Sequence, residues 1–406
     1  MSKYLKEDLR HIWKMVESFL IWLNRNGYYS YDQYDFWSTV YGKFAKGIYY
    51  KNHILGSPLV VPIFLLELFF PHYRVLMVRK KRFPISDAHF IMGYVNLFKI
   101  TRNNEFLDEA KKISDELLKT TIKGYSGYCW GYPFDWQTNR GLRKKGTPLI
   151  TTTPYCFEAF LILYDITKEQ KYFDVAQSIS QFVLRDLNET VISDISSACS
   201  YTPFDKSMVV NANAYRAFCL MEAYHRFGTD RLKESAIKNI NFVLENQRSD
   251  GSWLYAVDND QDAFVDNFHT CFVLKNLYKA NVYLKSNKVK DAIIKGYNFY
   301  RKNLFTNNNV PKPYSVLKRI QLVKIEMYDY TEAISLGVLL KNEIPEAFEL
   351  AKKLAQNVHL DYQLPDGHFI TRLNLVGLRN TVPYLRWPQA QMFYALTTLL
   401  KNMVND

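Results

Sequence analysis

Two pairs of side chains that can exchange protons stand at the same spacing in the second half of the chain. Asp266 precedes His269 by three residues, and Asp329 precedes Glu332 by three, which places both members of a pair on one helix face. Carboxylates on neighbouring helices could flank a glycosidic bond. A His, or a Tyr near Arg386, could instead abstract a proton next to a uronate carboxylate that the arginine neutralises. These five residues are the candidate catalytic set, with both chemistries open.

Further polar and aromatic side chains gather at the starts of apolar helices and in the loops before them. Capping of free backbone N–H groups explains about one Asn, Asp or Thr per helix start and leaves the others for binding. The loop at 124–137, GYSGYCWGYPFDWQ, sets aromatic rings beside a carboxylate, which suits stacking on a sugar and binding of its hydroxyls. We predict as substrate-binding residues Trp130, Tyr132, Asp135, Trp136, Asn211, Asn213, Trp253, Tyr255, Arg372, Trp387 and Gln389.

Signals for metal or cofactor binding are weak. Asp258, Asp260 and Asp262 alternate as in a calcium loop, but the Gly and the closing Glu of such a loop are missing. No GxSxG, phosphate-binding or dinucleotide Gly motif follows a predicted strand. We therefore predict no metal site and no cofactor.

The candidate residues lie at the starts of six almost wholly apolar helices. These helices begin about sixty residues apart, and a short turn and a second, Lys-rich helix follow nearly every one of them. Apolar helices with few charges are surrounded by protein, whereas helices with one charged face border water. The repeat predicts an all-α (α/α)6 toroid, a six-hairpin barrel, with inner helices that open near Ser86, Thr152, Val210, Asp266, Asp329 and Trp387.

Loop lengths predict where the functional face lies. Turns from inner to outer helix are short, whereas the returning loops run to about twenty or thirty residues, and long loops in compact domains are often functional. Because every long loop precedes an inner helix, the loops and the inner-helix N-termini share one rim. We expect the main pocket there, walled by Trp130, Tyr132, Trp136, Trp253 and Trp387.

The two ends of the chain complete the repeat. The helix predicted at 5–26 has no inner partner, and the last apolar helix, 388–402, has no outer partner. The simplest closure makes residues 1–26 the sixth outer helix, so that residues 1–406 form a single toroid domain. Residues 27–84 are expected to form an irregular N-terminal segment.

Composition limits the classes of partner. The net charge is +12, but many of the lysines lie on the second helices and no nucleic-acid-binding module is present, so we expect no nucleic-acid partner. The charge is compatible with an anionic polysaccharide or membrane. Five cysteines without metal-ligand spacing, and an N-terminus without signal-peptide layout, predict a cytoplasmic protein. The oligomeric state is not predicted.

An apolar stretch at 54–71 is followed by a basic cluster at 79–82. Glu67, two prolines and a length below the usual ~20 residues argue against a membrane-spanning helix. We favour a helix packed within the toroid. The alternative is a peripheral, monotopic contact with the inner membrane through residues 54–82.

Three segments resemble a family of surface-polysaccharide biosynthesis proteins. NGYYSYDQYDFWS resembles the family's GYDPYD opening, VDNFHTCFVLKNLY its DNFHTGFVLESL element and LRWPQAQMFYAL its RWGQAWMFYAL close. The DNFHT element is also similar to one in the helical domain of glucuronyl C5-epimerases. The resemblance spans most of the chain and implies a helical toroid that belongs to capsule or exopolysaccharide assembly.

Two hypotheses of function follow. The first is an enzyme that acts on a glycan, most simply an anionic one, by C5-epimerase or lyase chemistry or by glycosidase chemistry. The second is a non-catalytic glycan-binding or scaffold protein of the same pathway, because one fold can host both roles. Both predict an oligosaccharide or polysaccharide partner. Convergence of the candidate catalytic residues in one pocket would favour the enzyme.

Overall fold

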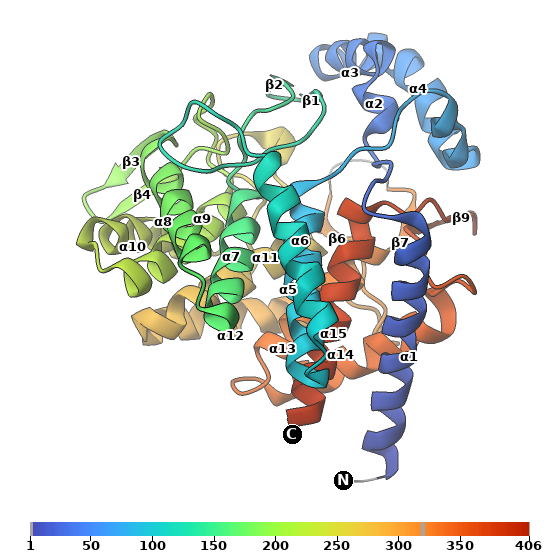
Figure 1. The fold of residues 1–406 in the computed structure, drawn as a ribbon. Coiled ribbons are helices and arrows are strands. Elements are labelled where there is room, and N and C mark those ends of the chain that lie inside the picture. Colours follow the sequence, from blue (N-terminus) through green and yellow to red (C-terminus); the bar gives the residue numbers. More distant parts are fainter. Residues whose placement is uncertain (1–2, 318–320, 406) are drawn as a thin grey trace.

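A closed ring of apolar helices forms the centre of the molecule. The computed structural model describes residues 3–317 and 321–405, and within these ranges six inner helices each contact the next, the last contacting the first (Figure 1). They are buried over most of their length because protein surrounds them. The predicted (α/α)6 toroid is thus confirmed, with inner helices α5 (Pro84–Thr101), α7 (Thr153–Thr167), α9 (Val210–Phe227), α11 (Asn267–Leu284), α13 (Met327–Leu339) and α15 (Ala390–Asn405).

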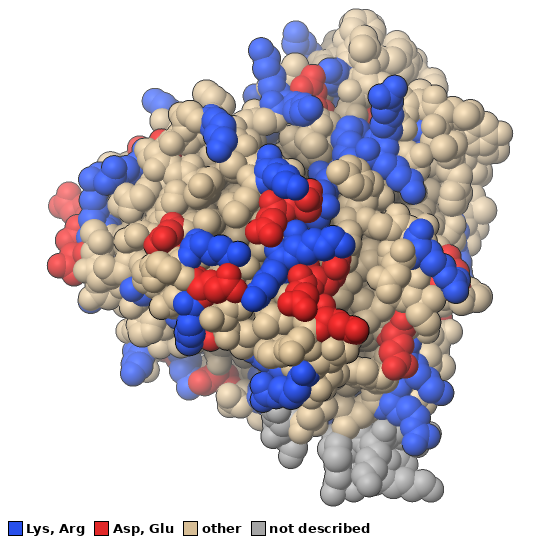
Figure 2. Space-filling view, in the orientation of Figure 1, with Lys and Arg blue, Asp and Glu red and all other residues tan. Residues whose placement is uncertain are grey.

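An outer layer of amphipathic helices surrounds this ring. In α6 the buried residues Ala110, Ile113, Ser114 and Leu117 follow helical spacing, so one face packs inward and the other borders water. Figure 2 shows Lys, Arg, Asp and Glu interspersed over this outer surface. The outer helices in the described ranges are α1 (Lys3–Asn26), α6 (Asn104–Lys119), α8 (Gln170–Arg185), α10 (Asp230–Glu245), α12 (Asn287–Asn303) and α14 (Pro345–Asn357).

Helix α1 occupies the place of the outer helix that α15 lacks. It contacts both α14 and α15. Phe19 of α1 is fully buried and stacks near Phe90 of α5, Phe369 and Phe393 of α15, with ring centroids 5.6 to 6.5 Å apart. The first and last helices of the chain therefore meet through one aromatic cluster.

The two rims of the toroid differ in their connections. Four inner helices end in a residue with left-handed backbone, Arg102, Lys168, Gly228 or Lys285, and the outer helix starts two residues later in each case. The returning loops are long and carry short antiparallel pairs of strands. In the described ranges these are β1 (Trp136–Thr138) with β2 (Gly141–Arg143), β3 (Glu189–Ser193) with β4 (Ser196–Cys199), β5 (Val265–Asp266) with β6 (Tyr314–Val316), and β7 (Val323–Glu326) with β8 (Arg372–Asn374) and β9 (Arg379–Asn380).

Residues 27–84 differ from our expectation of an irregular segment. They contain α2 (Asp35–Ser38), α3 (Val40–Lys51), α4 (His53–Phe69) and the 3-10 helix η1 (Pro71–Leu76). The helix over the apolar stretch, α4, packs on α3 at the rim instead of within the toroid (Figure 1). The six outer positions are already filled by α1, α6, α8, α10, α12 and α14, so α4 has no place in the ring.

Candidate functional site

A cleft of about 710 Å³ opens at the rim that carries the long loops. It lies where we expected the main pocket, because its lining includes the N-terminal ends of α5, α7, α9, α11 and α13 and the turn that leads into α15. The contributing residues, in ring order, are Ile85, Tyr155, Asn211, His269, Tyr328 and Arg386.

Eight of the predicted site residues line this cleft. Three come from the candidate catalytic set, and five from the candidate substrate-binding set. They are Asp266, His269 and Arg386, with Tyr132, Trp136, Asn211, Tyr255 and Trp387. The sequence therefore located the cleft and part of its lining, while the rest of the predicted set lies elsewhere.

Two of the tryptophans that we predicted to line the pocket do not line it. Trp130 is fully buried and its indole N–H donates to the carbonyl of Leu117 at 3.0 Å. Trp253 is 3% exposed and donates to the carbonyl of Val243 at 2.8 Å. Their loops turn back from the rim, so both rings fill the space between inner and outer helices.

Four predicted binding residues hold loops together outside the cleft lining. Asn213 accepts from the Cys199 backbone N–H at 2.7 Å, and Gln389 accepts from and donates to the Phe369 backbone at 3.0 and 2.6 Å. Arg372 pairs with Glu326, and Asp135 pairs with Lys43 at 2.6 Å. Each side chain is saturated by a protein partner, which explains its place better than substrate binding does.

The second predicted acid–base pair does not reach the cleft either. Asp266 caps α11 from the position before its first residue, whereas Asp329 is already the third residue of α13. The helical rotation of about 100° per residue therefore turns Asp329 away from the rim, and Glu326 takes the capping position of that repeat. Glu332 is buried and pairs with Lys275.

Asp329 is a buried carboxyl group whose burial is not compensated by hydrogen bonds in the described part of the chain. It is fully buried, and among the described residues neither oxygen has a hydrogen-bond partner. Burial, followed by the nearby carboxyl groups of Glu326 and Asp266, raises the pKa of Asp329 well above its ordinary value. Since the charged form is costly to bury, Asp329 is protonated in the folded chain over a wide pH range.

Replacing Asp329 with Asn should stabilise the protein at neutral pH. Because the folded pKa lies above the unfolded value of 3.8, stability is greatest below that value and falls as the pH rises toward the folded pKa, by about 1.4 kcal/mol per pH unit. D329N removes this loss, so urea unfolding at pH 4, 5.5 and 7 should show a flatter dependence. The exposed D291N on α12 is the control, and an unchanged slope in D329N would contradict the assignment.

The remaining pair, Asp266 and His269, forms a dyad at the start of α11. One carboxylate oxygen of Asp266 accepts from the His269 backbone N–H at 3.1 Å, and the other from Nδ1 of its ring at 2.6 Å. The Asp266 side chain is 1% exposed and that of His269 is 22% exposed. Nδ1–H is thereby committed to the carboxylate, which leaves Nε2 as the ring nitrogen available at the cleft.

Aromatic rings hold the imidazole from several sides. The centroid of the His269 ring lies 4.5 Å from Tyr255, 4.3 Å from Phe268 and 5.6 Å from Phe272. This packing and the bond to Asp266 fix the ring orientation, as a general base requires.

Arg386 lines the cleft, but its guanidinium is already paired with the carboxylate of Asp32. Its guanidinium donates to both carboxylate oxygens of Asp32 at 2.6 and 2.8 Å, and to the Tyr132 hydroxyl at 3.3 Å. Burial lowers the pKa of Arg386, but the Asp32 carboxylate together with Tyr132 and Tyr34 outweighs burial and raises the pKa above its ordinary value. We missed Asp32, although it lies in the YDQYD segment that carries the family resemblance.

Two further arginines line the cleft in the described part of the chain, and we missed both. Arg140 donates to Asp258 at 2.6 and 2.8 Å and to Asp262 at 2.9 Å, so the acidic loop holds an arginine. Arg143 lies over Tyr201 at 4.3 Å and over Trp136 at 5.1 Å. The Asp205 carboxylate lies 3.9 Å from its guanidinium.

Two tyrosine hydroxyls meet in the cleft, and we missed these as well. The hydroxyl oxygens of Tyr155 and Tyr215 are 2.5 Å apart. Burial and the nearby Glu332 raise the pKa of both phenols well above the ordinary value, so both are protonated near neutral pH. Tyr155 lies in the first turn of α7 and Tyr215 in the second turn of α9, close to polar residues that were the available signal.

Comparison with known proteins establishes the fold. No family model matches the chain, and no curated protein sequence matches it, so the family resemblance of the motifs stays a prediction. Among solved structures, cellobiose 2-epimerase from Bacillus thermoamylovorans has a TM-score of 0.60 at 12% identity, over 80% of this chain and 88% of that chain. An unsaturated glucuronyl hydrolase specific for heparin has 0.60 at 11%, over 81% and 88%. A polysaccharide lyase has 0.54 at 11%, over 79% and 90%.

Proposed function

We propose that the protein is an enzyme that abstracts a proton next to the carboxylate of a uronate in a glycan, by C5-epimerase or lyase chemistry. The observation that carries this proposal is the His269 ring, oriented by Asp266 and available at the cleft through Nε2. A positioned His of this kind is the commonest general base in enzymes. The toroid neighbours that act on sugars support a glycan as the substrate.

The cleft supplies the other groups that such a reaction needs. Removal of the proton leaves negative charge on the carboxylate of the sugar, which a nearby arginine stabilises. Arg140 and Arg386 are each saturated by aspartates, so Arg143 is the cleft arginine that we assign to the substrate. The protonated Tyr155–Tyr215 pair is the group we assign to protonating the opposite face of the sugar in an epimerase.

The glycosidase alternative is weaker. It needs two carboxyl groups that face one glycosidic bond from about 5 to 9 Å apart. The candidate partners of Asp266 fail this requirement, because Asp329 is buried away from the cleft and Glu332 is paired with Lys275. Assembly of a surface polysaccharide is the pathway we propose, on the strength of the three motifs that resemble that family.

Incubation of the purified chain with hexuronate oligosaccharides in deuterium oxide tests the proposal. If the enzyme is an epimerase, we expect deuterium at C5 of a uronate, detected by mass spectrometry and NMR. An epimerase gives deuterated product of unchanged chain length, a lyase gives an unsaturated sugar, and a glycosidase gives new reducing ends without C5 exchange. Binding without exchange or cleavage would favour the non-catalytic glycan-binding alternative.

Replacing Arg143 with Gln should weaken uronate recognition. A hydrogen-bonded charge is worth about 1.5–3 kcal/mol, so kcat/KM should fall about 10- to 100-fold, through KM for the lost contact with the carboxylate and through kcat for the charge that develops on it. The exposed R185Q at the end of α8 removes an equal charge outside the cleft lining and should be neutral. If R143Q lowers kcat/KM equally on a substrate whose carboxylate has been reduced to an alcohol, Arg143 does not recognise the carboxylate.

A further inference from the structure

Helix α4 presents an apolar stripe to solvent. Ile54, Pro58, Val61, Leu65 and Phe69 are all exposed and recur every three or four residues, so they share one side of the helix. Ile54 is 84% exposed and Leu65 is 44% exposed. Only Gly56 and Ile63 of this helix are buried, so packing on α3 leaves most of its surface uncovered.

The apolar surface continues through the 3-10 helix that follows. Phe70, Tyr73, Val75, Leu76 and Met77 are each more than half exposed. Figure 2 shows the corner of the molecule over α4 as nearly uninterrupted by charged side chains. A contiguous exposed patch of this kind marks an interaction site.

The charges around this surface are almost all positive. Between residues 36 and 86 the sequence has eight Lys or Arg and one acidic residue, Glu67. Glu67 is turned inward, where it accepts from the indole N–H of Trp37 at 3.0 Å and lies 3.5 Å from the Arg74 guanidinium. Lys51 at one end of the stripe, and Arg79 and Lys80 at the other, are exposed.

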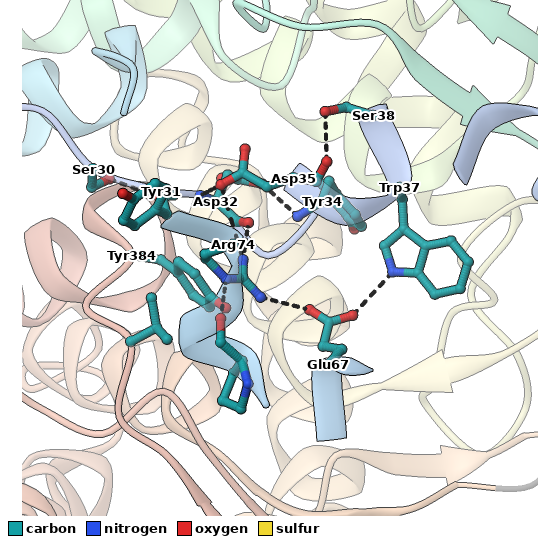
Figure 3. Close-up of polar contacts among 12 residues, drawn as sticks. Ser30, Tyr31, Asp32, Tyr34, Asp35, Trp37, Ser38, Glu67, Arg74 and Tyr384 are labelled. Carbon is teal, nitrogen blue, oxygen red and sulfur yellow. Dashed lines mark hydrogen bonds and ion pairs between the residues drawn. The ribbon is translucent and has the colours of Figure 1, made fainter. Parts of the chain in front are cut away.

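The stripe is held rigidly to the toroid. Arg74 is fully buried and donates to the carbonyl of Asp32 at 2.5 Å (Figure 3). Its guanidinium lies over the rings of Phe36 and Tyr384, each 4.6 Å away. The start of α4 is capped by Asn52. The exposed face is therefore a fixed feature of the fold.

We propose that α4 and η1 dock on an anionic lipid bilayer and lie in the plane of its surface. Within the described ranges no helix is long and apolar enough to cross a membrane, and the 17 residues of α4 span about 25 Å, less than the ~30 Å hydrocarbon core. Apolar side chains enter the acyl boundary while the flanking basic residues contact anionic headgroups.

A second copy of the chain fits this surface less well. A two-fold interface brings the same patch of two molecules together, so the Lys51 and Arg79–Lys80 ends would contribute only positive charge from both sides. An anionic bilayer turns those charges into an attraction. Because His53 at the start of α4 and Tyr49 and Tyr50 of the adjoining α3 line the cleft, docking also brings the cleft mouth close to the membrane.

Flotation of the full chain with vesicles tests the proposal. We expect binding to phosphatidylcholine vesicles that contain phosphatidylglycerol. L55D/L65D places charges on Leu65 of the stripe and on the adjacent exposed Leu55, and should lose at least about tenfold in affinity. R79Q/K80Q should lose about fivefold per charge removed on anionic vesicles, and little on pure phosphatidylcholine.

The control variant V191D/I195D changes two equally exposed side chains of the β3–β4 hairpin on another part of the molecule and should bind as the native chain does. H269Q should also bind normally, so that this test stands apart from the proposed catalysis. The proposal is overturned if the native chain does not float, or if L55D/L65D floats equally. It is also overturned if light scattering shows a dimer that L55D/L65D disperses and vesicle binding is absent.

Discussion

Replacing His269 with Gln should lower the rate of C5 proton exchange about 100- to 10,000-fold, the usual contribution of a general base. Gln can still bond to Asp266 but cannot take up a proton at neutral pH. The melting temperature should change little, because the His269 side chain is partly exposed and Asp266 still accepts the backbone N–H that caps α11. Deuterium incorporation and thermal unfolding, measured on one preparation, test both statements.

The matched control is His225→Gln. His225 is exposed at the C-terminal end of α9, on the rim opposite the cleft, so its loss should leave exchange unchanged. Exchange at the native rate in H269Q would remove His269 from the mechanism. A large fall in melting temperature without a change in the rate per folded molecule would make it a structural residue.

Local signals in the sequence predicted the fold and part of the site. Helical periodicity is set within one helix and loop length between two, so the toroid and its functional rim could be read without knowledge of distant contacts. Asp266 and His269 were found for the same reason, because one turn of helix holds both. The prediction for Asp329 and Glu332, which have equal spacing, was wrong, because α13 starts three residues earlier relative to its aspartate than α11 does.

Other parts of the site depend on contacts between residues that are far apart in the sequence, and local spacing does not predict such contacts. Asp32 and Arg386 are 354 residues apart in the chain, and their pairing exists only because α1 and α15 bring the two ends of the ring together. Trp130 and Trp253 are of the right residue type for a sugar site, but the sequence does not show that their loops fold back under the rim. The position of α4 on the rim likewise depends on α1, which fills the last outer place.

The pair of Asp32 and Arg386 should be the most costly to break in the described chain. The Arg386 side chain is 3% exposed and that of Asp32 is fully buried, so R386M leaves an aspartate charge without its partner in the interior. Removal of one member of a buried ion pair costs about 3–5 kcal/mol. Urea unfolding at pH 7 should show this loss, whereas K43M, which breaks the half-exposed pair with Asp135, should cost less than about 1 kcal/mol.

The double variant D32N/R386M distinguishes a charge effect from lost packing. Asn at position 32 removes the uncompensated charge, so the double variant should be more stable than R386M alone, although it carries one more substitution. Such non-additivity is expected only for residues that interact directly. If the losses of the single variants instead add up in the double variant, the contribution of Arg386 is its contact with the rings of Tyr34 and Tyr132, 5.3 and 4.5 Å away, and the ion pair only orients it.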